Sequence, residues 1–220
     1  MSVTKESTIE AVLFDFGGVL TTSPFDAVAS LGDAAGVPRR RVGELVFGPY
    51  HEDTDHAWHR LERGEITVAA WLDDIRPQLE AEGLVLDLEA FAGAFRAVTV
   101  NDAVVGKVRS LRQGGYRIAL VTNNVAEGSS AWRAMIPVEE LFEVVVDSSA
   151  VGMRKPDAAI YHHTLGLLGG VAPEKSVFLD DAPGNVEGAR RAGLHAILVG
   201  PDPAPALAEL DALLNSHSRV

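Results

Sequence analysis

The ten residues AVLFDFGGVL, positions 11–20, contain the pattern that decides the fold. Their first four members, Ala11–Phe14, are apolar on both faces, as expected of a strand that helices cover on two sides. Asp15 follows at the point where this strand ends, and Gly17 and Gly18 let the backbone turn tightly and approach a ligand. A polar residue at the end of a buried strand is typical of a ligand site in an open α/β sheet.

Four further apolar runs predict the other strands. These runs are Ile118–Thr122, Val144–Val146, Val177–Leu179 and Ala196–Val199. Helical patterns lie over Asn101–Gln113, Pro156–Leu168 and Asn185–Ala192, and a short terminal helix is predicted over Ala206–Leu214. The alternation of strands and helices predicts a parallel, doubly wound sheet.

One long stretch, residues 22–98, interrupts this alternation because it contains no convincing strand. Its segments around 25–35, 39–47, 54–62, 67–80 and 87–97 have helical patterns, and Thr67 is a candidate N-cap. We therefore expect an α/β protein with a Rossmann-like parallel sheet core, residues 1–21 and 99–220. Residues 22–98 would form a helical cap inserted into that core.

The composition excludes several classes of protein. With 47% hydrophobic and 23% charged residues, the 220-residue chain is unlike a disordered one. No apolar run approaches the ~20 residues that span a bilayer, and the polar start MSVTKESTIE lacks the apolar centre of a signal peptide. The absence of cysteine excludes disulfides and thiolate metal sites. We expect a cytoplasmic protein.

The net charge of -12 repels nucleic acid and anionic membranes, so we expect neither as a partner. A divalent cation and a local lysine can nevertheless reverse the field inside one cleft. A small phosphorylated substrate therefore stays compatible with this charge. The sequence carries no signal for the oligomeric state.

Polar residues stand at three predicted strand ends. They are Asp15, the pair Thr122-Asn123, and the pair Asp180-Asp181; Lys155 stands at a helix start in VGMRKPD. Because ligands gather at the carboxyl ends of parallel strands, we expect these groups to converge. A carboxylate can attack phosphorus, and the spread negative charge of the transition state needs a cation and hydrogen-bond donors.

Each residue type suits one part of that chemistry. Asp15 and Asp181 can supply the carboxylate oxygens that Mg²⁺ prefers. Lys155 offers a positive charge to the phosphate and to the nucleophile. The Thr122 hydroxyl and the backbone N–H of Asn123 can bind phosphate oxygens.

Four ordered motifs, FDFGGVL, LVTNN, GMRKPD and VFLDD, resemble those of the haloacid dehalogenase-like hydrolase superfamily. The segments RGEIT and GNVEGAR resemble the subgroup that contains the N-terminal phosphatase domain of soluble epoxide hydrolase. The resemblance implies Asp15 as nucleophile, Thr122 and Lys155 as phosphate binders, and Asp181 as a direct metal ligand. Asp180 would support the metal shell, and the cap would follow the first motif.

The sequence departs from this family at Gly17. Family phosphatases usually carry there an aspartate that protonates the leaving group and then activates water. The Gly17 carbonyl can still bind the metal, but the acid/base group is missing. Three outcomes follow: restriction to good leaving groups, replacement by a cap histidine such as His51 or His56, or a protein that binds phosphorylated ligands with little turnover. We predict a magnesium-dependent phosphohydrolase that forms an aspartyl-phosphate at Asp15, slow or restricted in its substrates.

Two neighbouring features have simpler interpretations. The segment His51–His59 contains histidines and acidic residues that could bind a metal, although a solvated helical face explains them equally well. Arg154 could assist Lys155 in binding phosphate, but we favour the interpretation that it does not.

Overall fold

Five parallel strands form one sheet in the order β3-β2-β1-β4-β5. The computed structural model describes residues 9–217. The strands are β1 Ala11–Phe14, β2 Arg117–Thr122, β3 Val144–Asp147, β4 Ser176–Asp180 and β5 His195–Leu198. All five predicted strands are confirmed, to within one residue at either end.

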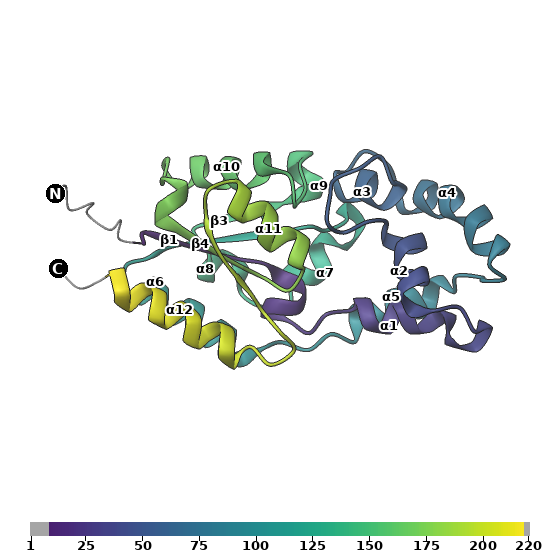
Figure 1. Cartoon of the computed structure of the whole chain (residues 1–220), viewed down its shortest axis with the longest axis horizontal. Coiled ribbons are helices and arrows are strands. Elements are labelled where there is room, and N and C mark those ends of the chain that lie inside the picture. Colours follow the sequence, from purple (N-terminus) through teal and green to yellow (C-terminus); the bar gives the residue numbers. More distant parts are fainter. Residues whose placement is uncertain (1–8, 218–220) are drawn as a thin grey trace.

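Helices cover both faces of the sheet (Figure 1). On one side lie α10 and α11, and on the other α6 and α12. Neighbouring side chains of β1 enter two different cores, with Ala11 and Leu13 in one and Val12 and Phe14 in the other. These helices, with the shorter ones beside the sheet, are α6 Asp102–Gln113, α7 Ser129–Arg133, α8 Val138–Leu141, α9 Ser148–Val151, α10 Ala158–Leu167, α11 Pro183–Arg191 and α12 Ala204–His217.

Five further α-helices, which we call the cap helices, lie between β1 and α6 in the chain. They occupy the end of the molecule toward which the strands point (Figure 1). They are α1 Phe25–Ala29, α2 Arg39–Phe47, α3 Ala57–Glu62, α4 Val68–Ala81 and α5 Leu88–Arg96. A hydrophobic cluster of their own, with Trp58 and Trp71 buried in it, packs them together. The exact limits of the predicted core and cap stay a prediction.

Two chain segments join the cap helices to the sheet, and these segments pair with each other. The Thr22 N–H donates to the Thr99 carbonyl over 2.9 Å, and the Asn101 N–H donates to the Leu20 carbonyl over 2.8 Å. Thr21 and Val100 form the antiparallel bridge between them. The chain therefore passes between the sheet and the cap helices at one narrow place.

Side chains that accept hydrogen bonds from the first free N–H groups decide where two of the helices begin. Thr67 caps α4 as predicted, since its hydroxyl accepts from the Ala70 N–H. The prediction that Pro156 opens a helix is wrong: α10 begins at Ala158 because the Asp157 carboxylate accepts from the Ala159 N–H and acts as the N-cap. In the part of the chain that the structure describes, no helix combines the length and apolar character needed to cross a membrane.

Candidate active site

The carboxyl ends of β1, β2 and β4 meet at the sheet edge that faces the cap helices. Because β1 lies between β2 and β4, Asp15 stands between Thr122 and the pair Asp180-Asp181. Lys155, from the segment before α10, reaches the same place: its Nζ lies 2.6 Å from Asp15 Oδ1. The structure thus brings together Asp15, Lys155, Asp180 and Asp181, with Thr122 at the end of the adjoining strand.

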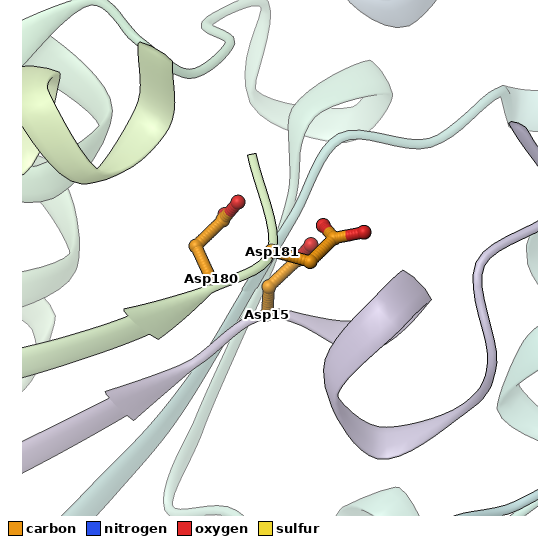
Figure 2. A group of neighbouring side chains, drawn as sticks. All are labelled: Asp15, Asp180 and Asp181. Carbon is orange, nitrogen blue, oxygen red and sulfur yellow. The ribbon is translucent and has the colours of Figure 1, made fainter. Parts of the chain in front are cut away.

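Three carboxylates form the acidic part of this site. Figure 2 shows Asp15 at the end of β1 and Asp180 and Asp181 at the end of β4. Each offers one oxygen atom, and these three atoms lie within 4.8 Å of one another. Asp15 and Asp180 are buried, and Asp181 is half-buried.

Burial makes these negative charges costly. Burial raises the pKa of Asp15 well above its usual value, Lys155 opposes this shift, and the charges of Asp180 and Asp181 add to it. Burial, reinforced by the charge of Asp180, raises the pKa of Asp181 to about 7. A cation beside these oxygens would relieve the repulsion, and an all-oxygen, anionic donor set is the kind that Mg²⁺ takes. The residues present therefore fit a magnesium ion.

Asp180 holds Lys155 in place. Its Oδ2 accepts from Lys155 Nζ over 2.7 Å, and its carboxylate oxygens both accept from Asn185 Nδ2 over 3.1 Å. The Ala182 N–H donates to Oδ1 over 2.8 Å. Sequence reasoning did not find Asn185 as a site residue. Its signal is its place in the first turn of α11, directly after the Asp180-Asp181 pair.

Asn123 fixes the backbone of Lys155. Its Oδ1 accepts from the Lys155 N–H over 2.9 Å, and its Nδ2 donates to the Lys155 carbonyl over 3.0 Å. The side chain of Asn123 therefore orients Lys155, so phosphate binding by Asn123 is left to its backbone N–H. Thr122 is buried, and its hydroxyl accepts from Asn124 Nδ2 over 3.5 Å.

The two glycines after Asp15 have different requirements. Gly18 has a φ of 78°, and an added Cβ would lie 1.9 Å from Asp181 Oδ2. Gly17 has φ -72° and ψ 129°, values open to any residue, and among residues 9–217 no atom beyond its own and its chain neighbours' lies within 4 Å of an added Cβ. Gly18 is thus needed for the approach of Asp181, whereas no steric reason requires glycine at position 17.

The cap histidines differ in their surroundings. His56 Nδ1 accepts from the Trp58 N–H and caps α3, while His59 is fully buried and its Nδ1 accepts from the Thr54 N–H. Burial lowers the pKa of His59 to about 3. The side chain of His51 is exposed, and its backbone packs against the start of α11.

Comparison with known proteins identifies the family. The model of the haloacid dehalogenase-like hydrolases matches residues 9–193. The chain belongs to this family. The family resemblance predicted from the four motifs is therefore confirmed, and this hydrolase shares its Rossmann-like α/β fold with solved members. One is a HAD family enzyme of Bacteroides thetaiotaomicron, solved as a complex with magnesium and inorganic phosphate; its TM-score is 0.63 at 22% identity, over 88% of this chain and 96% of that one.

Similar sequences include one protein of comparable length and others that are much longer. The sesquiterpene phosphatase astK of Aspergillus oryzae is 30% identical, over 86% of this chain and 88% of its own length. Bifunctional epoxide hydrolase 2 of Rattus norvegicus is 28% identical over 92% of this chain, as expected from the subgroup resemblance. Acyl-CoA dehydrogenase family member 10 of Mus musculus is 30% identical over 93% of this chain. This chain spans 38% of the length of the epoxide hydrolase and 19% of the length of the acyl-CoA dehydrogenase family member.

Proposed function

We propose that this hydrolase is a magnesium-dependent phosphatase of a small phosphorylated metabolite, with Asp15 as nucleophile. The observation that carries the proposal is the 2.6 Å contact between Lys155 Nζ and Asp15 Oδ1 inside the buried acidic group. Burial alone would favour a neutral Asp15, and the ammonium group favours the ionised form that can attack phosphorus. The names of two relatives, the astK phosphatase and a phosphoglycolate phosphatase of Pseudomonas putida, agree with this chemistry.

The metal would be held by the carboxylates of Asp15 and Asp181 and by the Gly17 carbonyl. Bound there, Mg²⁺ supplies positive charge to the phosphate oxygens and to the crowded carboxylates. The magnesium and phosphate in the Bacteroides thetaiotaomicron enzyme support the same kind of site here. Asp180 contributes indirectly, because it orients Lys155.

The chain's own residues would act in two steps. First, a carboxylate oxygen of Asp15 attacks phosphorus, the bond from phosphorus to the ester oxygen breaks, and an aspartyl-phosphate forms. Lys155 and Thr122 stabilise the negative charge on the transferring group. Water then attacks the phosphorus and releases inorganic phosphate together with the free Asp15 carboxylate.

Gly17 limits the leaving groups that this site can expel. It offers no side chain to protonate the departing oxygen, and no other described residue beyond its chain neighbours has an atom within 4 Å of the Cβ position where such a group would begin. General acid–base catalysis contributes typically about 10²–10⁴-fold, so poor leaving groups would be expelled slowly. The same observation favours the second candidate, a phosphate-ligand-binding protein with little turnover.

A direct assay separates the two candidates. A phosphatase releases p-nitrophenol from p-nitrophenyl phosphate only when Mg²⁺ is present, and Asp15→Asn abolishes this release. A binding protein shows thermal stabilisation by inorganic phosphate without turnover of any member of a panel of phosphorylated metabolites. Turnover that is independent of Mg²⁺ or survives Asp15→Asn would refute the proposed mechanism.

A further inference from the structure

A buried ion pair connects the cap helices to the active-site segment. Arg154 Nε lies 2.8 Å from Glu62 Oε2, and both residues are at most 1% exposed. Glu62 is the last residue of α3, whereas Arg154 directly precedes Lys155. The chemistry proposed above uses neither residue, although burying two charges is costly.

Further contacts show that this pair lies on the boundary between the two parts. Arg154 Nη1 also donates to the Glu52 carbonyl and to Asp53 Oδ1, both over 3.3 Å. The second oxygen of Glu62 accepts from the Tyr50 hydroxyl over 2.7 Å. The Arg154 guanidinium, which comes from the core, is thus hydrogen-bonded to acceptors that all belong to the cap.

The Glu62 carboxylate also reaches the residue that fixes Lys155. Asn123 Nδ2 lies 3.4 Å from Glu62 Oε2, while the same Asn123 amide pairs with the N–H and carbonyl of Lys155. Contacts therefore run from α3 through Glu62 and Asn123 to the backbone of Lys155, whose Nζ touches Asp15. A second connection is covalent, because Arg154 and Lys155 are neighbours in the chain.

Backbone packing shows that the cap helices lie closed on the core. An added Cβ at Gly184, in the first turn of α11, would lie 2.5 Å from the His51 Cα and from the Tyr50 carbonyl oxygen. One at Gly64 would lie 2.4 Å from the Ser149 carbonyl oxygen. Because only two paired segments tie the cap helices to the sheet, contacts across this boundary decide whether they stay closed.

We propose that the Arg154–Glu62 ion pair is a latch that holds the cap helices closed and couples their position to that of Lys155. Both are positioning residues. Opening the cap would return both charges to water, so the pair is a reversible fastening. Arg154 Nη2, buried without a hydrogen-bond partner among the described residues, would also gain water on opening. The effect on catalysis rests on the proposed function, but the latch itself does not.

The absence of cysteine from the chain permits a direct measurement. Spin labels at Val85→Cys on the cap, where the side chain is 90% exposed, and at exposed Ser110→Cys on α6 report the distance between cap and core. Glu62→Gln keeps the size and hydrogen-bonding capacity of the side chain and removes its charge. We expect it to add a population with a longer distance, and Arg154→Met to enlarge that population. Lys107→Met is the control, since it breaks a more exposed core ion pair to Asp211, 2.7 Å long, that lies away from the cap.

Amide hydrogen exchange tests the coupling. Glu62→Gln replaces the charged acceptor of Asn123 Nδ2 by a neutral one, and a hydrogen bond to a charged partner is roughly twice as strong as one to a neutral partner. Asn123 is then held less firmly, so the Lys155 N–H, which donates to Asn123 Oδ1, should exchange about tenfold faster. Amides of β1 should be unaffected, and kcat should fall more than KM rises.

An unchanged distance distribution, or an unchanged exchange rate at Lys155, would overturn the proposal. If Arg154→Met does not fold, Glu62→Gln alone decides. Absence of hydrolysis by the native chain would count against the phosphatase proposal, and the distances between the spin labels would still test the latch.

Discussion

Replacing Gly17 by aspartate should widen the range of leaving groups that the proposed phosphatase expels. The backbone at Gly17 is already in an ordinary conformation, and no residue in the described part of the chain, its chain neighbours aside, lies within 4 Å of an added Cβ. The Cβ of the new side chain therefore meets no obstacle, in contrast to that of Gly18→Ala, which would collide with Asp181. A positioned acid is worth about 10²–10⁴-fold. We expect about 10²-fold, the lower end, because the chain around position 17 was not arranged to orient a carboxyl group there.

The measurement is kcat/KM over substituted phenyl phosphates and one alkyl phosphate. In the native chain the rate should fall steeply as the pKa of the leaving group rises, since the departing oxygen leaves without a proton. Gly17→Asp should flatten this dependence and gain most on the alkyl phosphate. Gly17→Asn is the matched control, because it has nearly the same size and cannot donate a proton as an acid.

Two results would refute the reasoning. Equal rates of Gly17→Asp and Gly17→Asn on the alkyl phosphate would mean that another group, such as His51, already protonates the leaving group. A shallow dependence in the native chain would lead to the same conclusion. Both variants must first show the Mg²⁺-induced thermal shift of the native chain, since a fourth carboxylate adds repulsion to a group that is already crowded.

Three further predictions concern stability. Asp15→Asn should raise the melting temperature of the metal-free protein at about pH 8, since it removes a carboxyl whose pKa is raised and whose charge is therefore destabilising there; a lower melting temperature would contradict this. Asp181 has a folded pKa of about 7 against a usual 3.8, so unfolding releases a proton between these values, and the stability of the metal-free protein falls as pH rises through that range. Mg²⁺ needs the ionised carboxylate, so its thermal shift should be larger at about pH 8 than at about pH 5.5, and equal shifts would argue against metal binding at this carboxylate. Gly184→Ala should lower the free energy of unfolding, measured in urea, by about 1–3 kcal/mol, because its Cβ would meet the backbone of His51. Gly106→Ala, in open space on α6, should raise it by roughly 0.5–1 kcal/mol. Similar effects of the two substitutions would contradict the close packing at Gly184.

The sheet and much of the candidate site could be predicted because local sequence determines them. An apolar run covered on both faces, such as Val177–Leu179, can be recognised without knowing its partners. Parallel strands place their carboxyl ends at one edge, so the approach of Asp15 to Asp181 follows from topology. The prediction that a helix starts at Pro156 was wrong because the Asp157 side chain accepts from the Ala159 N–H and caps the helix two residues later.

Contacts between distant segments could not be predicted. Arg154 and Glu62 lie 92 residues apart, and only the folded chain shows that the arginine beside Lys155 turns toward the cap. The sequence did not indicate that the side-chain amide of Asn123 would pair with the Lys155 backbone and Glu62, whereas phosphate binding by its backbone N–H stays a prediction. Hydrogen-bond partners of a side chain depend on tertiary geometry, which residue type and spacing do not encode.

The charge of the site decides how phosphate can enter it. Ionised Asp15, Asp180 and Asp181 together with the Lys155 ammonium leave two negative charges in a buried group, and a phosphate dianion would be repelled. One divalent cation neutralises this excess. Inorganic phosphate should therefore stabilise the protein against heat only when Mg²⁺ is present, and by linkage Mg²⁺ should bind more tightly when phosphate is present. Equal phosphate binding with and without Mg²⁺ would show that phosphate binds elsewhere, or that protons take the place of the cation at these carboxylates.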